Sequence, residues 1–149
     1  MDKLDILFEM QRKLNDHTFK KNHITDNEGH ILTMDKLIND ARDKPLSRDS
    51  NSITNEWLKK YLWALGDESR ELQDELNQKW WSKDYLDMQN IRVEIVDQLH
   101  FWLSLAMVSG MDSDKVFSIY QQKNEVNIQR QNNGYNAKDK TEDDNRTIV

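Results

Sequence analysis

The chain has 149 residues, a formal net charge of −6 and no cysteine. The lack of cysteine excludes disulfides, zinc–thiolate sites and thiol catalysis, and the length leaves room for one domain with a buried core. Acidic and basic residues are interspersed, which argues against a protein that binds mainly a nucleic-acid backbone. The acidic start is unlike a signal peptide, and no apolar run reaches the roughly 20 residues of a membrane span. We therefore expect a soluble, cytoplasmic protein whose partners are neither nucleic acids nor membranes.

Only four glycines and one proline are present, which favours helices joined by polar loops. Apolar residues at helical spacing predict a first helix over residues 3–16 and a shorter one around residues 34–41, with a connection over 17–31 between them. A long amphipathic helix is predicted from Thr54, a candidate N-cap, to about residue 78. The segment 79–84 breaks this pattern and is expected to be a loop.

A second long helix is predicted over residues 88–108, and its later half is apolar on nearly every face, so it must be enclosed on several sides. Gly110 is expected to follow its end as the C′ glycine, and residues 112–114 to cap the next helix. Beyond Tyr135 the chain is almost wholly polar. The sequence therefore predicts one all-α domain over residues 1–135 and a disordered tail over 136–149.

Two pairs of acidic residues indicate a metal site. Glu68 and Glu71 lie three residues apart on the first long helix, and Glu94 and Asp97 repeat this spacing on the second. Residues three apart share a helix face, so two facing helices would bring four carboxylates together, and their repulsion would call for a cation. Hard oxygen ligands suit Mg²⁺, with Mn²⁺ as a substitute. One such pair alone is usually a solvated face, but the second lies among apolar residues, where an unpaired carboxylate is costly to bury.

Two further polar patterns have a functional and a structural interpretation. Gln11 and Asn15 lie four residues apart on the first helix, and their amides suit the edge of a nucleobase, although an exposed pair is the commoner meaning of this spacing. Lys123, Asn127 and Arg130 form one stripe on the last predicted helix. Such a stripe either meets a triphosphate or faces solvent.

Taken together, these residues resemble the dimeric, all-α dUTPases within the superfamily of MazG-like nucleoside triphosphate pyrophosphohydrolases. The order of the acidic pairs around a tryptophan-containing loop is typical of that superfamily, while residues 7–15 and 120–135 resemble the first and last motifs of the dimeric dUTPases. The resemblance covers residues 4–16 and 56–135 and is strongest to compact phage-type members. It implies a MazG-like helical bundle with a four-helix core, assembled as a homodimer.

The resemblance also implies an activity, namely hydrolysis of dUTP to dUMP and pyrophosphate by a water that Mg²⁺ activates. All four acids would hold the metal, with Glu71, or alternatively Glu68, nearest the attacking water. Gln11 and Asn15 would reach the pyrimidine, and Trp81 would line the base pocket, with Trp80 as the alternative. The sugar and phosphates would meet four residues near the end of the chain: Lys123, Asn127, Arg130 and Tyr135.

Other functions remain open at the level of sequence. One is a broader specificity for dUTP and dCTP, and another is a MazG-like house-cleaning activity on several nucleotides. A third, from a different class, is a non-catalytic helical protein such as a phage regulator, although a retained quartet of acids speaks against loss of chemistry. Residues 17–55 match no motif, so the sequence leaves that part of the pocket undefined.

Overall fold

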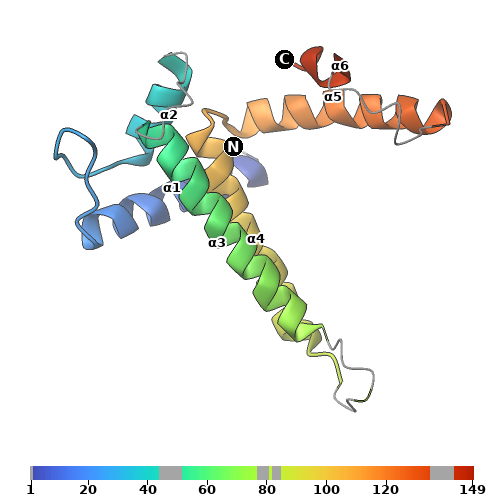
Figure 1. Ribbon diagram of the computed structural model, residues 1–149, viewed down its shortest axis with the longest axis horizontal. Helices are drawn as coiled ribbons and strands as arrows, with labels where there is room; N and C mark the ends of the chain where they lie inside the picture. The colour runs from blue at the N-terminus through green and yellow to red at the C-terminus, as the bar shows by residue number, and fades with distance from the viewer. Residues whose placement is uncertain (1, 44–51, 77–80, 82–84, 135–142) are drawn as a thin grey trace. The chain divides into compact units, whose positions relative to one another are not determined.

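The structure, a computed structural model, describes residues 2–43, 52–76, 81, 85–134 and 143–149 (Figure 1). These residues form α-helices and no strand, which confirms the predicted all-α fold. The helices are α1 (Lys3–Lys21), α2 (Met34–Asp43), α3 (Ile53–Glu75), α4 (Met88–Val108), α5 (Ser113–Asn132) and α6 (Asp143–Arg146). The chain divides at Gly110 into one unit with α1 to α4 and a second with α5 and α6.

Helix α1 continues to Lys21, well beyond its predicted end near residue 16. Its buried face contains two amide side chains as well as two aromatic ones: Phe8, Gln11, Asn15 and Phe19. These positions follow one helical stripe, so the last turn of α1 is stabilised by the buried Phe19. A pattern judged from apolar residues alone ends too early because half of this stripe is polar.

Helix α3 begins before the predicted N-cap. The side chain of Ser52 accepts a hydrogen bond from the backbone of Asn55, so Ser52 is the N-cap, and the prediction for Thr54 was wrong. Thr54 lies inside the first turn and is almost completely buried. The end of α3 at Glu75 agrees with the prediction to within a few residues.

Helices α3 and α4 lie side by side and run in opposite directions (Figure 1). The predicted bounds of α4 are confirmed, and Gly110 follows its end with a left-handed φ of +84°. The predicted cap after it is also confirmed, because the side chain of Asp112 accepts from the backbone of Lys115 at the start of α5. Leu103, Ala106, Met107 and Val108 of α4 are buried. None of the described helices combines the length and apolar character that a membrane span requires.

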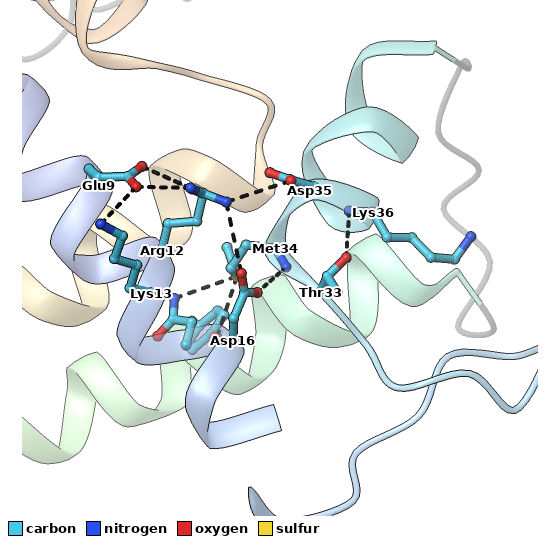
Figure 2. A network of polar contacts seen from close by, with 10 residues as sticks. Glu9, Arg12, Lys13, Asp16, Thr33, Met34, Asp35 and Lys36 are labelled. Carbon is cyan, nitrogen blue, oxygen red and sulfur yellow. Dashed lines mark hydrogen bonds and ion pairs between the residues drawn. The ribbon is translucent and has the colours of Figure 1, made fainter. Parts of the chain in front are cut away.

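A polar network fixes the start of α2 against α1 (Figure 2). The carboxylate of Asp16 accepts a hydrogen bond of 2.7 Å from the backbone N–H of Met34, and the Arg12 guanidinium lies 3.6 Å from the Asp35 carboxylate. This hydrogen bond satisfies a backbone donor that the first turn of α2 cannot satisfy itself. The Met34 side chain is therefore held in the core beside Asn15.

The second unit is built around α5, none of whose residues is buried. Helix α6 and the residues after it bond to α5, for example through Gln122, which exchanges two hydrogen bonds with the backbone of Val149. The predicted domain end at residue 135 lies outside the described residues and stays a prediction. The predicted tail over 136–149 is described only from residue 143 onward.

Candidate active site

Three carboxylates from α3 and α4 converge. Oxygen atoms of Glu68, Glu94 and Asp97 all lie within 4.8 Å of one another. Glu71, one turn after Glu68, is outside this group and is exposed, but it lies close enough to act on the charge of both Glu68 and Glu94. The antiparallel pairing of two long helices thus brings acids from positions 26 residues apart into one cluster.

The electrostatics of this acidic cluster favour a cation. Partial burial, together with repulsion by Glu71, Asp97 and other carboxylates, raises the pKa of both Glu68 and Glu94 above the ordinary value. One oxygen of Glu94, Oε2, is buried and has no hydrogen-bond partner among the described residues. Asn90 approaches only the other oxygen, at 3.4 Å. An unpartnered buried carboxylate oxygen beside two further acids fits a hard divalent cation such as Mg²⁺.

A cavity of about 600 Å³ lies between α1, α3 and α4 next to this cluster. Glu68, Glu71 and Asp97 form part of its wall. Two amide side chains, Gln11 and Asn15, form another part. The remaining lining is mainly aromatic and aliphatic, with one imidazole and two hydroxyl groups: Leu14, Thr18, Phe19, Ile24, Trp57, Tyr61, His100 and Phe101. A site of this size with few polar groups is typical of pockets for small organic ligands.

The two amides are buried and joined to each other. Gln11 Nε2 donates to Asn15 Oδ1 at 2.9 Å, and Asn15 Nδ2 donates to Ser104 Oγ on α4 at 2.9 Å. Gln11 and Asn15 are 5% and 6% exposed, so they are not the solvated pair that their spacing alone would favour. Buried amides that are still accessible from a cavity can read the edge of a ligand that carries donors and acceptors.

Sequence reasoning did not single out the aromatic wall of the cavity. Trp57 and Tyr61 lie one turn apart on α3, and their ring centroids are 5.5 Å from each other, while Phe101 on α4 lies 6.4 Å from Tyr61. Their spacing from the acids in the sequence could have identified them, because Tyr61 precedes Glu68 by two helical turns and Phe101 follows Asp97 by one. These aromatic residues therefore share a helix face with the carboxylates.

Two predicted site residues lie elsewhere or are not described. Trp81 is 66% exposed and does not line the cavity formed by the described residues. Its assignment to the base pocket stays a prediction. Tyr135 lies outside the described residues.

The stripe on α5 lies in the second unit. Arg130 is half-buried, and both its Nε and Nη2 lie 2.9 Å from Asp144 Oδ2. Lys123 Nζ donates to Asn145 Oδ1, whereas Asn127 is exposed. The stripe therefore does not simply face solvent, because two of its members contact α6.

The chain is similar to known proteins over most of its length. A dUTPase family model matches residues 3–113, a range that contains both acidic pairs and the two amides but not residues 120–135. The chain is 29% identical to the dCTP pyrophosphatase of Enterobacteria phage LZ5 over 128 residues, covering 67% of this chain and 74% of that protein. It is 26% identical to the dCTP pyrophosphatase of Enterobacteria phage T4 over 149 residues, covering 90% of this chain and 83% of that protein. No solved structure matches the chain significantly. Because the family match spans most of the chain and the fold is all-helical, the protein belongs to the all-α dUTPase family.

Proposed function

We propose that the protein hydrolyses dUTP to dUMP and pyrophosphate in a magnesium-dependent reaction. The observation that carries the proposal is the cavity beside the acidic cluster, which combines two buried amides, an aromatic wall and three carboxylates. Amides and aromatic rings suit the edge and face of a pyrimidine, while a carboxylate cluster suits the metal that accompanies a triphosphate. Membership of the dUTPase family supports the same reaction class.

Glu68, Glu71, Glu94 and Asp97 are the residues that would hold magnesium. When bound, the metal would shield the phosphate charges and lower the pKa of a coordinated water. Glu71 lies outside the tight group of three and is exposed toward the cavity, so its carboxylate is the one we assign to accept the proton of the attacking water. Glu68 is the alternative for this role.

Gln11 and Asn15 are proposed to hydrogen-bond the base, which would lie against the aromatic wall of Trp57, Tyr61 and Phe101. Trp81 remains a proposed further contact to the base. For the phosphates and sugar we propose Lys123, Asn127, Arg130 and Tyr135, because a lysine and an arginine on one helix face offer positive charge to a triphosphate.

The second candidate substrate is dCTP. It is favoured by one specific observation, namely that both similar phage proteins are named dCTP pyrophosphatases. A homodimer is also part of the proposal. Large apolar residues remain exposed on α1, α3 and α4, among them Met10, Trp63 and Val96, and a second copy of the chain would cover such a surface.

The test is pyrophosphate release from dUTP, dCTP, dTTP, dATP and dGTP, each with Mg²⁺ and with a chelator. We expect rapid release from dUTP or from dUTP and dCTP, and none in chelator. Equal rates on all five nucleotides would support a house-cleaning enzyme instead. If the protein releases no pyrophosphate, whether or not it binds these nucleotides, the result would support the non-catalytic alternative.

A further inference from the structure

A directed chain of hydrogen bonds runs from α4 to the amides of the cavity. Ser104 Oγ lies 2.9 Å from the backbone carbonyl of His100, which can only accept, so the single hydroxyl proton of Ser104 is donated there. Only lone pairs of Ser104 are then left for Asn15, whose amide must turn its NH₂ group toward Ser104. The opposite orientation would place two oxygens 2.9 Å apart with no hydrogen between them.

The amide of Gln11 is fixed by its contact with Asn15. Because Asn15 turns Nδ2 toward Ser104 and Met34, its Oδ1 faces Gln11, and Gln11 must turn Nε2 toward it. Gln11 Oε1 is then the amide oxygen of the pair that accepts no hydrogen bond from any described residue. The polarity of both amides therefore follows from the backbone carbonyl of His100, which can only accept a hydrogen bond.

Ser104 lies behind the cavity wall. It is fully buried and does not line the cavity, whereas Gln11 and Asn15 do. Its side chain reaches the polar part of this lining through the hydrogen bond from Asn15, while its hydroxyl proton is held by the backbone carbonyl of His100.

This orientation matters for pyrimidines because uracil and cytosine differ in polarity at two adjacent atoms. Uracil has a donor at N3 and an acceptor at its 4-position, whereas cytosine has an acceptor at N3 and a donor at its 4-position. An amide that is fixed in one orientation matches one of these edges and opposes the other, while an amide that can rotate by about 180° matches both.

We propose that Ser104 is a positioning residue that sets the discrimination between uracil and cytosine nucleotides by fixing the polarity of Asn15 and Gln11. The inference rests on the proposed function, in which these amides face the base. It differs from that proposal in assigning the choice of base to a side chain that touches no substrate.

The experiment replaces the acceptor behind Asn15 and measures kcat/KM for dUTP and dCTP. Ser104→Ala removes the acceptor, and Ser104→Cys keeps the side-chain size but offers only a weak one. Ser109→Ala is the matched control, because the Ser109 hydroxyl also donates to a backbone carbonyl, that of Ala106, and the residue is exposed. We expect the ratio of kcat/KM for the preferred nucleotide to kcat/KM for the other one to fall toward one. The fall should be about tenfold in both Ser104 variants and less than about twofold in the control.

A purely structural role would lower kcat/KM for both nucleotides by the same factor and leave the ratio unchanged, and that result would overturn the proposal. A wild-type protein that takes both nucleotides equally would also overturn it. The dissociation constants of the α,β-imido analogues of dUTP and dCTP give the same ratio without turnover. If the wild type releases no pyrophosphate, the proposed function fails. The role of Ser104 is then decided by the ratio of the two Kd values: a ratio that changes in the Ser104 variants would support it, and an unchanged ratio would reject it.

Discussion

Replacing Asn15 by alanine should reduce both stability and substrate selectivity, by amounts that follow from its contacts. Asn15 is buried and makes two side-chain hydrogen bonds of 2.9 Å, to Gln11 and to Ser104. Each neutral hydrogen bond contributes about 1 kcal/mol net, and leaving the fully buried Ser104 without this partner costs about 1 kcal/mol more. We therefore expect a loss of about 2–3 kcal/mol in the free energy of unfolding. For a chain of this length that corresponds to a fall in Tm of roughly 6–10 °C.

Thermal unfolding followed by circular dichroism measures this loss, with Asn39→Ala as control because Asn39 is exposed on α2. The control should change the free energy of unfolding by less than about 0.5 kcal/mol. In Asn15→Ala, kcat/KM should fall much more for dUTP than for a poor purine substrate such as dATP, because only the pyrimidine edge loses a matched hydrogen bond. A Tm equal to that of the control, together with equal losses on both nucleotides, would refute the assignment of Asn15.

The variants Glu94→Gln and Asp97→Asn should each abolish turnover while the helical content measured by circular dichroism stays unchanged. Since burial and neighbouring carboxylates raise the pKa of Glu94 above its ordinary value of 4.5, the metal-free wild type should lose stability as pH rises from 4.5 through this raised pKa. Glu94→Gln should show a smaller loss, because only Glu68 then keeps a raised pKa, so at neutral pH the variant should unfold at the same temperature as the wild type or at a higher one. Normal turnover in either variant would remove the metal assignment. Sedimentation at micromolar concentration should give about twice the chain mass, and a stable monomer would mean that the exposed apolar surface has another purpose. Phe101→Ala should raise KM for dUTP more than Trp81→Ala does, because Phe101 lines the cavity, and the reverse order would restore Trp81 as the main aromatic contact.

Helix α4 and the acidic cluster could be predicted from the sequence because both depend on local spacing. Asp97 follows Glu94 by one turn, and an apolar run with a glycine after it fixes the end of the helix whatever the rest of the chain does. The same holds for Glu68 and Glu71 on α3. What spacing cannot give is the distance between the two pairs, which depends on how α3 and α4 pack.

The amides and the aromatic wall show where local reasoning stops. Asn15 and Ser104 are 89 residues apart in the chain, so their hydrogen bond has no counterpart in any helical repeat. Tyr61 and Phe101 share a helix face with the carboxylates, but ordinary core residues have the same spacing, and only the packing of three helices leaves a cavity in front of them. Trp81 was assigned to the base pocket through the family resemblance and its place in a loop, and neither determines which way a side chain points.

The role of Arg130 can be separated from the ion pair that it makes. If Arg130 binds phosphate, Arg130→Ala should lower kcat/KM for dUTP, dCTP and dTTP by a similar factor, about 10–100, because hydrogen bonds to a charged group are worth about 1.5–3 kcal/mol and phosphates are common to all three. The matched variant is Asp144→Ala, which breaks the same pair of 2.9 Å but keeps the guanidinium.

An ion pair whose carboxylate is 46% exposed contributes about 0–1 kcal/mol to stability, so Asp144→Ala should unfold at nearly the wild-type temperature. Its kcat/KM should be unchanged or higher, because the carboxylate no longer competes with phosphate for Arg130. Added salt should weaken substrate binding less in Arg130→Ala than in the wild type. If Asp144→Ala instead lost as much activity as Arg130→Ala, Arg130 would act by holding α6 on α5. If Arg130→Ala changed the ranking of the three bases, the assignment of the phosphate end of the substrate to α5 would have to be abandoned.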